Sequence, residues 1–282
     1  MKLVENKIFD EERALYGSSD TVVKNCRFEG AADGESALKE SSDIVAENCF
    51  FALRYPFWHD TGVCIRDSEM TATCRAALWY SRFVHLEDSK LHGIKALREC
   101  SDVTIRGCDI VSAEFGWFTR SVLVRDTRAE GEYFMMGADV LDFENFQFKG
   151  KYSFQYITGA VFENCTFDTK DAFWHAKNVT VKNSIIKGEY LAWYAENITF
   201  ENCKISGTQP FCYCQGLKLI NCEMTDADLS FEKSDVEATI TTPVISIKNP
   251  SSGYIVLPYA DEIIITDENA KCTITELTPK CK

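Results

Sequence analysis

A short phrase of the form apolar-x-apolar-x-Asn-Cys-x-apolar recurs through this chain of 282 residues, and for most of its length the spacing is 19 residues. Examples lie at residues 103–110, 161–167, 198–205 and 217–224. A fixed period of this length indicates stacked identical units, each of which buries its apolar face only against its neighbours. The repeat therefore constrains the architecture before any single residue is considered.

The Asn position of the phrase predicts a tight bend in every repeat. Its column contains only Asn, Asp or Gly, namely Asn25, Asn48, Asp67, Asp88, Gly107, Asp126, Asn145, Asn164, Asn183, Asn202 and Asn221. These residue types tolerate a positive φ angle, which a tight left-handed bend requires. Stacked Asn side chains can also hydrogen-bond from one repeat to the next.

The residues around the bend predict short strands. Before it, apolar residues alternate, as at Val103 and Ile105, and a period of two indicates a strand with one buried face. After it, a second short strand points Cys and apolar side chains inward, glycines such as Gly131 mark another corner, and a third, aromatic segment follows. We therefore predict an all-β fold, a single-stranded parallel β-helix (β-solenoid) with about 11–13 coils, three short strands per coil and capped ends.

A leucine-rich repeat is the main architectural alternative. Its pattern places two residues between the second Leu and the Asn, whereas this chain has one, and its convex segment is absent here. The β-helix is predicted to form a single domain over residues 1–282. Residues 1–19 would form an N-terminal cap with a helix at 9–15, residues 20–231 the regular coils, and residues 232–282 irregular coils and a second cap.

Composition excludes several classes of partner. The formal net charge is −13 and the isoelectric point is near 4.9, which argues against nucleic acid or an anionic membrane surface. The first residues carry no secretory signal, and no apolar run is long enough to cross a membrane. We expect a cytoplasmic protein, so its thirteen cysteines are expected to be reduced and mostly buried.

The third segment of each repeat collects most of the unusual residues. Two sets of aromatic residues alternate along it. One set is Trp58, Trp117, Trp174 and Trp193, and the other is Phe57, Phe154, Phe173 and Phe211. We expect the Trp set to point inward, because its neighbours carry fewer charges. With either choice, the outer face keeps a long aromatic stripe.

A contiguous exposed apolar stripe indicates a ligand groove or a protein interface. Aromatic rings mixed with carboxylates, imidazoles and phenol hydroxyls suit the faces and hydroxyls of sugar rings. The predicted ligand-binding residues are Tyr152, Tyr156, Phe173, Trp174, His175 and Tyr194. The alternative is a non-enzymatic scaffold whose aromatic face is covered by a second copy, another partner or a terminal segment.

Catalysis is only weakly indicated. Glycoside hydrolysis needs two carboxyl groups roughly 5 to 9.5 Å apart, whereas strand geometry separates Glu99 from Glu114 by about 14 Å. If the protein is an enzyme, a polysaccharide lyase or a glycoside hydrolase is the leading expectation. The candidate catalytic residues are Lys95, Glu99, Glu114, Asp171 and His175. Lys95 stacked beneath Glu114 is also consistent with simple charge pairing between coils.

The cysteine ladder has two interpretations. Cys203 and Cys222 are one coil apart, and neighbouring thiolates could bind a soft metal. The same column elsewhere contains Ser, Thr and Phe, which favours core packing, because Cys also behaves as a small buried apolar residue. The sequence therefore predicts no metal and no cofactor.

Five stretches resemble a known family. They lie at residues 9–17, 54–60, 75–80, 95–100 and 171–175. They look like an uncharacterised bacterial domain-of-unknown-function family of similar length, which belongs to the pectate-lyase-like right-handed β-helix group. The resemblance covers the whole chain and implies a right-handed coil, but it supplies no catalytic residues, and the acidic clusters of the group's enzymes are absent from the sequence.

Overall fold

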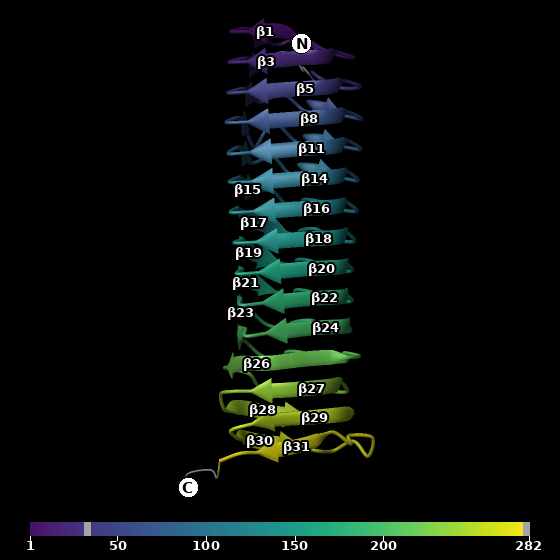
Figure 1. The fold of residues 1–282 in the computed structure, drawn as a ribbon, viewed down its shortest axis with the longest axis vertical. Coiled ribbons are helices and arrows are strands. Elements are labelled where there is room, and N and C mark those ends of the chain that lie inside the picture. Colours follow the sequence, from purple (N-terminus) through teal and green to yellow (C-terminus); the bar gives the residue numbers. More distant parts are fainter. Residues whose placement is uncertain (31–34, 279–282) are drawn as a thin grey trace. The chain divides into compact units, whose positions relative to one another are not determined.

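The structure is a computed structural model that describes residues 1–30 and 35–278. Its contacts divide the chain into two compact units, unit 1 (Met1–Asp142) and unit 2 (Phe143–Lys282), and each is described by itself. The described residues contain strands and turns but no helix, and they make about 14 turns. Within each unit, the front strands of Figure 1 run leftward while the chain descends, which is the sense of a right-handed coil. The predicted right-handed parallel β-helix is confirmed.

Unit 1 has three columns of strands. The first is β1 (Lys2–Glu5), β3 (Ser19–Lys24), β5 (Ser42–Glu47), β8 (Thr61–Arg66), β11 (Arg82–Glu87), β14 (Ser101–Arg106) and β16 (Arg120–Arg125). The second is β2 (Ile8–Phe9), β4 (Arg27–Phe28), β6 (Phe50–Phe51), β9 (Glu69–Met70), β12 (Lys90–Leu91), β15 (Asp109–Val111) and β17 (Arg128–Glu132). The third is β7 (Phe57–Trp58), β10 (Leu78–Trp79) and β13 (Leu97–Arg98). The division between the units falls within β18 (Asp139–Glu144).

Unit 2 contains strands of the first two kinds of column, whereas its third segments at 152–156, 171–175 and 190–194 form turns and bends. Its first column is β20 (Thr158–Glu163), β22 (Lys177–Lys182), β24 (Glu196–Glu201), β26 (Leu217–Thr225), β27 (Asp235–Ile240), β29 (Ser252–Leu257) and β31 (Thr273–Glu276). Its second is β19 (Gln147–Lys151), β21 (Thr166–Lys170), β23 (Ile185–Lys187) and β25 (Lys204–Ser206), and the end of β26 pairs with β25. β28 (Val244–Lys248) and β30 (Ala260–Ile264) form a small sheet of their own.

The register of the first column places equivalent residues above one another. Val23 pairs with Ala46, Ala46 with Ile65, and Ile65 with Leu86, and all four are fully buried. Alternate residues point outward and are partly or fully exposed. Because apolar side chains of successive coils stack in register, the core of each unit is a continuous column, as the period of two predicted.

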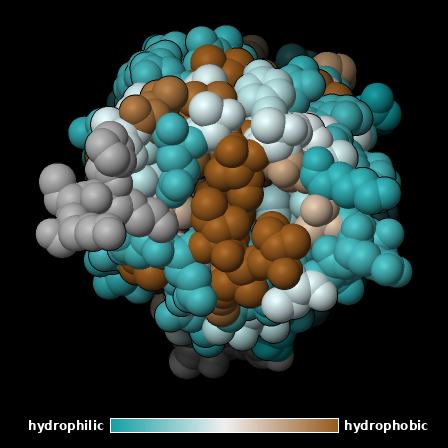
Figure 2. All heavy atoms as spheres, turned by 90° about the horizontal axis from the view of Figure 1, so that it is seen from below, coloured by the Kyte–Doolittle hydropathy of each residue, from teal (hydrophilic) through white to brown (hydrophobic). Residues whose placement is uncertain are grey.

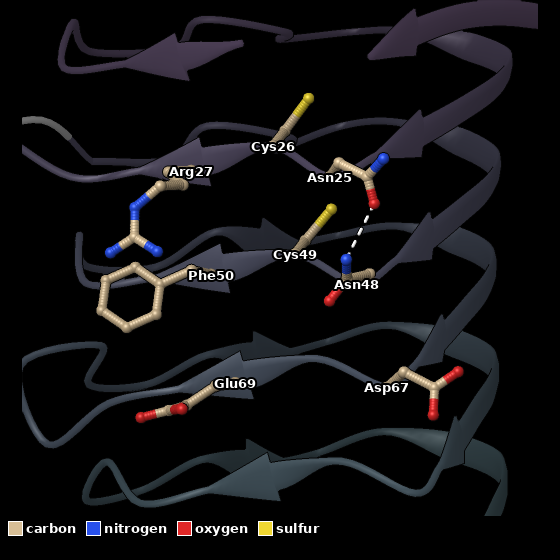
Figure 3. Close-up of a pocket in the computed structure, with 8 residues that line it drawn as sticks. All are labelled: Asn25, Cys26, Arg27, Asn48, Cys49, Phe50, Asp67 and Glu69. Carbon is tan, nitrogen blue, oxygen red and sulfur yellow. Dashed lines mark hydrogen bonds between the residues drawn. The ribbon is translucent and has the colours of Figure 1, made fainter. Parts of the chain in front are cut away.

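The Asn corner forms as predicted. Asn25, Asn48 and Asn202 have φ angles of 51°, 51° and 52°. The Nδ2 of Asn48 donates to the Oδ1 of Asn25 at 2.8 Å (Figure 3), and the Nδ2 of Asn221 donates to the Oδ1 of Asn202 at 2.8 Å. These hydrogen bonds between stacked amides give partners to polar side-chain groups that would otherwise lack them at the bend.

Phenylalanine and cysteine side chains fill the core. Phe28 stacks on Phe51 in unit 1 at 4.9 Å, and Phe154 stacks on Phe173 in unit 2 at 5.5 Å. Ten of the twelve cysteines in the described part of the chain are buried, and none of the twelve forms a disulfide. Core packing is thus the role of the cysteine ladder, as expected.

The expectation that the Trp set points inward is wrong. Phe57, Phe154, Phe173 and Phe211 are fully buried, whereas Trp58, Trp117, Trp174 and Trp193 are half-buried at the outer surface. The physical reason is the indole N–H group, which must find an acceptor when it leaves water. At the surface, Trp174 Nε1 donates to the carbonyl of Tyr190 at 2.7 Å, while the Phe ring carries no polar atom and packs inside.

The helix predicted at residues 9–15 is also wrong, because this segment forms turns. The backbone N–H groups of Arg13, Leu15 and Gly17 donate to the carbonyls of Glu35, Ala37 and Lys39. They therefore bind the next coil and leave no i→i−4 ladder. Pairing of β1 with β3 shows that stacking begins at residue 2, not at residue 20.

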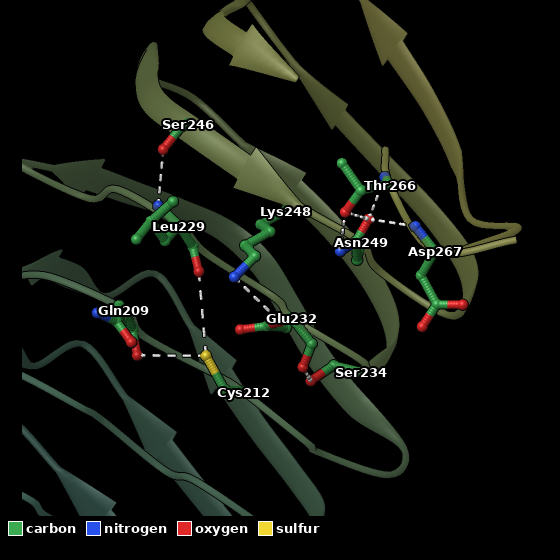
Figure 4. Close-up of polar contacts among 10 residues, drawn as sticks. All are labelled: Gln209, Cys212, Leu229, Glu232, Ser234, Ser246, Lys248, Asn249, Thr266 and Asp267. Atoms are coloured by element: carbon green, nitrogen blue, oxygen red, sulfur yellow. Dashed lines mark hydrogen bonds and ion pairs between the residues drawn. The ribbon is translucent and has the colours of Figure 1, made fainter. Parts of the chain in front are cut away.

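An Asn corner also occurs after residue 231, in the region predicted to be irregular. Asn249 has a φ of 43°, and its Oδ1 accepts from the backbone N–H of Thr266 at 2.7 Å and of Asp267 at 3.1 Å (Figure 4). Nearby, Lys248 Nζ and Glu232 Oε1 form an ion pair at 3.1 Å. The Asn corner therefore ties successive coils together in this irregular region as well. The single-domain organisation stays a prediction.

Candidate functional site

The outward side chains of the third segments form what we call the aromatic face, which is described within each unit. In unit 2, alternate residues of the segment have positive φ angles, as at Asp171 (55°), Phe173 (60°) and His175 (54°). This backbone buries Phe173 and turns Trp174 and His175 toward solvent. The face of unit 2 consists of Tyr152, Tyr156, Trp174, His175, Tyr190, Trp193, Tyr194 and Tyr213.

Four rings of this face form a ladder along unit 2. Tyr156 stacks on His175 at 4.9 Å, His175 on Tyr194 at 5.0 Å, and Tyr194 on Tyr213 at 4.8 Å, with interplanar angles of 8° or less. Tyr156 and Tyr194 are 55% and 41% exposed. The ladder exists because the same position of successive coils carries an aromatic ring, and coils repeat at the spacing of a parallel sheet. We call these four residues the Tyr–His ladder.

A second column of rings lies one residue before the Tyr–His ladder. Trp174 and Trp193 stack at 5.4 Å with an interplanar angle of 4°, and Tyr190 meets Trp193 edge-on at 5.5 Å. Each indole N–H donates to a main-chain carbonyl of the following coil, Trp174 to Tyr190 and Trp193 to Gln209, both at 2.7 Å. These bonds fix the indoles in place, so the face is preorganised.

The stacking decides what the ladder can offer a ligand. A ring that lies parallel to its neighbours at about 5 Å has both faces covered. Only the ends of the ladder present a ring face, and along its length the outer surface presents ring edges, phenol hydroxyls and an imidazole. The ladder is therefore a column of hydrogen-bonding groups set in an apolar wall.

The aromatic face of unit 1 is interleaved with cations. The guanidinium of Arg98 lies over the rings of Trp79 at 5.1 Å and Trp117 at 5.4 Å, and Lys39 Nζ lies over Trp58 at 5.5 Å. Such contacts stabilise by roughly 0.5 to 2 kcal/mol each. The sequence analysis missed this sandwich, although alignment of the repeats places Arg98 between Trp79 and Trp117.

The candidate catalytic residues of unit 1 are engaged in ion pairs. Lys95 Nζ lies 3.3 Å from Glu114 Oε2, and Arg98 Nε lies 3.5 Å from Glu99 Oε1. The charge-pairing interpretation of Lys95 and Glu114 is therefore confirmed. Glu99 and Glu114 are thus each held by a basic side chain, and a catalytic role for Lys95, Glu99 and Glu114 stays a prediction.

In unit 2, Asp171 and His175 play separate parts. His175 is sandwiched between Tyr156 and Tyr194 in the Tyr–His ladder. Asp171 is buried, and this burial raises the pKa of its carboxyl, an effect that Lys170 opposes and Glu189 reinforces. Lys170 itself pairs with Glu189 at 2.9 Å. Among the described residues, no hydrogen bond or ion pair joins Asp171 to His175.

Of the predicted ligand-binding residues, Phe173 is wrong. It is fully buried against Phe154, so no ligand on the outer surface can touch it. Tyr152, Trp174 and His175 are half-buried, and Tyr156 and Tyr194 are exposed. These five residues lie on the aromatic face of unit 2, and their role in binding stays a prediction.

A buried carboxyl that sequence reasoning missed lies in unit 1. Asp60 is 1% exposed, and its Oδ1 accepts from the backbone N–H of Ser41 at 2.8 Å. Its Oδ2 has no hydrogen-bond partner among the described residues. Burial raises the pKa of Asp60 to about 8, partly opposed by the bond from Ser41. Its column, with Ser41 and Ser81 on either side, is the sequence signal that marks it as inward.

Other surfaces carry less chemistry. A shallow pocket of about 340 Å³ lies at the Asn corner of unit 1, lined by Asn48, Asp67 and Glu69 among others (Figure 3). Figure 2, seen from below, shows apolar side chains gathered at the C-terminal end of unit 2. In the C-terminal part of this unit, Ile265 and Leu277 are 52% and 64% exposed. Within residues 1–30 and 35–278, no three His, Cys, Asp or Glu side chains are grouped as metal ligands. The described strands and turns include no helix that could span a bilayer.

Solved structures similar to this chain share little sequence with it. A mutant tailspike protein of E. coli bacteriophage HK620 in complex with a hexasaccharide is 8% identical, with a TM-score of 0.46, and 91% of this chain covers 61% of that one. The mannuronan C-5 epimerase A-module of Azotobacter vinelandii is 10% identical, with a TM-score of 0.30, and the match covers 98% of this chain and 87% of that one. PfbA, a surface adhesin of Streptococcus pneumoniae, is 9% identical, with a TM-score of 0.33, and the match covers 97% of this chain and 80% of that one.

The comparison with families is more direct. No curated protein matches the sequence. One family does, and its match spans residues 2–278, which is nearly the whole chain. The chain therefore belongs to the family described as "Protein of unknown function (DUF3737)".

Proposed function

We propose that the aromatic face of unit 2 binds an extended carbohydrate chain and does not cleave it. The observation that carries this proposal is the Tyr–His ladder, in which the exposed Tyr156 and Tyr194 repeat with His175 and Tyr213 at intervals of 4.8 to 5.0 Å. A saccharide chain also repeats, and it carries both apolar C–H surfaces and hydroxyls. A repeating wall of ring edges and hydroxyls suits such a ligand.

The mode of binding follows from the stacking. Because ring faces are covered by neighbouring rings, the sugar contacts the ladder through hydrogen bonds to phenol hydroxyls and through C–H groups packed on the ring edges. Rings held by stacking lose little side-chain entropy when a ligand binds, which favours binding. Cleavage is not proposed, because Lys95 and Glu114 are paired and His175 is held between two rings.

Binding should therefore depend on the hydroxyls. In a titration against a panel of soluble oligosaccharides, the unchanged protein should bind at least one of them. Tyr194→Phe keeps the ladder but removes one hydroxyl, and it should weaken binding by about tenfold, which corresponds to about 1.4 kcal/mol. Tyr254→Ala is the matched control, because Tyr254 is 45% exposed in the first strand column of unit 2 and should leave affinity unchanged.

Two results would contradict the proposal. One is the absence of binding to every oligosaccharide in the panel. The other is an equal loss of affinity on Tyr194→Phe and Tyr254→Ala, which would place the ligand elsewhere. Release of reducing ends or of unsaturated sugars during incubation would contradict the part of the proposal that excludes cleavage.

A second copy of the chain covering the face is the alternative function, and size measurement separates it from the first. Tyr156→Asp places a charge at the most exposed ring of the Tyr–His ladder. If light scattering after gel filtration detects a dimer that this substitution dissociates, the face is an interface. If the protein is monomeric both with and without the substitution, the face is not a dimer interface, and the result agrees with the carbohydrate proposal. A cytoplasmic location stays a prediction of the sequence.

A further inference from the structure

Two adjacent strands on the outer surface of unit 1 bring four reactive or charged side chains together. Cys64 and Arg66 lie on β8, and His85 and Glu87 lie on β11. The register pairs Cys64 with His85 and Arg66 with Glu87. Neighbouring strands of a sheet are about 4.8 Å apart, and these four side chains share the solvent face. The thiol and the imidazole are therefore neighbours.

A carboxylate lies beside the imidazole. Glu87 Oε2 lies 3.7 Å from His85 Nε2 and 3.4 Å from Arg66 Nε. A carboxylate beside one ring nitrogen favours the tautomer that carries its proton there, which leaves a lone pair on Nδ1. Nδ1 is then the nitrogen available to the neighbouring thiol. The strand register thus places a thiol beside an imidazole that has a carboxylate next to it, and these are the residue types of a nucleophile, a base and a group that orients the base.

The site is open to a small molecule. Cys64 and His85 line a pocket of about 320 Å³ together with Val45, Gly62 and Phe83. Phe83 is 60% exposed and provides an apolar wall beside the thiol. Of the cysteines in the described ranges, all but Cys64 and Cys272 are buried. Access and a neighbouring base thus coincide at Cys64.

We propose that Cys64 is a modification site for soft carbon electrophiles and that His85 is its base. Burial raises the pKa of the Cys64 thiol, an effect that Arg66 opposes, so the thiol keeps its proton near neutral pH unless a base removes it. In the reaction, the thiol proton passes to His85 Nδ1 while sulfur attacks the electrophilic carbon. A carbon–sulfur bond forms, the leaving group departs with its electron pair, and the imidazolium returns its proton to water.

Iodoacetamide is a suitable probe, with iodide as the leaving group, and mass spectrometry of peptides gives the rate at each cysteine. Cys281 lies outside the described residues and is replaced by serine in every protein tested. Cys272 serves as an internal reference, because it is also part-exposed and burial raises its pKa to about 11. In the folded protein, Cys64 should react at least about tenfold faster than Cys272, as assistance by a general base predicts.

His85→Gln keeps the size and polarity of the side chain but cannot accept the proton. It should slow labelling of Cys64 by about tenfold or more and leave the rate at Cys272 unchanged. His92→Gln is the matched control, because His92 is similarly exposed but pairs with Asp109 at 3.1 Å on another strand column. Equal rates at Cys64 and Cys272, or an equal effect of the two His substitutions, would overturn the proposal. Thermal unfolding of each variant confirms that only folded protein is compared.

Discussion

Asp60 makes the stability of this protein depend on pH in a direction opposite to that of most carboxyl groups. The pKa of its carboxyl rises from 3.8 to about 8, because burial disfavours the charged form. Between these values, the folded state holds a proton that the unfolded state has released. Stability must therefore fall as pH rises from about 4 to about 8, with a slope of about 1.4 kcal/mol per pH unit from this group alone.

Asp60→Ser removes the buried carboxyl, and with it this pH dependence of stability, with little other change to the fold. In the same column, Ser41 Oγ accepts from the backbone N–H of Ser18 at 3.1 Å, and Ser81 Oγ accepts from that of Asp60 at 3.2 Å. A serine at position 60 can accept from Ser41 in the same way. Near pH 4, the variant should be less stable than the unchanged protein by about 1 kcal/mol, because the smaller serine side chain makes fewer packing contacts at position 60. It should become the more stable one, by several kcal/mol, near pH 8.

Urea unfolding followed by circular dichroism at several pH values measures the difference directly. The quantity of interest is the free energy of unfolding of the variant minus that of the unchanged protein, which cancels the titration of all other groups. Asp10→Ser, which removes an exposed carboxyl from unit 1, is the control for the same change of residue type at the surface. Parallel stability curves for Asp60→Ser and the unchanged protein would refute the reasoning, because they would mean that Asp60 is ionised in the fold.

Three further predictions concern stability, and urea midpoints measure each of them. Gly188→Ala should cost more than about 3 kcal/mol, because its Cβ would lie 1.3 Å from the carbonyl oxygen of Thr169, whereas Gly159→Ala, at a φ of 68° with open space, should cost about 1 kcal/mol. Cys165→Ser should cost less than about 1 kcal/mol, because Ser184 in the same column already makes the equivalent bond to the carbonyl two residues before it. Trp193→Phe should cost about 1 kcal/mol, because the Gln209 carbonyl loses the indole N–H and keeps only the weak contact of the Cys212 thiol at 3.7 Å; a cost near zero would mean that the indole N–H bond does not hold the face.

The regular part of the fold could be predicted from the sequence because its signals are local. A residue type that tolerates positive φ marks the bend, and an alternation of apolar residues marks the strand before it. Repetition strengthens both signals, since the same pattern returns in every coil. The same local signals gave a wrong prediction for the N-terminal segment. Residues 9–15 look helical locally, but their backbone N–H groups donate to the next coil instead.

The aromatic face shows the limit of local reasoning. Trp174 and Phe173 are adjacent and both aromatic, so their residue types alone do not determine which of the two side chains points inward. The choice depends on an acceptor, the Tyr190 carbonyl, that belongs to another coil. The same holds for Asp60, whose burial and raised pKa arise from neighbours about 20 residues away in the chain.

By itself, the 19-residue period determined that this chain folds as a β-helix, because stacked repeats bury their apolar faces only against one another. The positions of bends, strands and core cysteines followed from the same columns. Only the tertiary structure decided which rings reach solvent, that their faces are covered by one another, and that Cys64 lies beside His85. These features depend on contacts between coils, and such contacts are set by side-chain packing and hydrogen-bond partners that no single repeat contains.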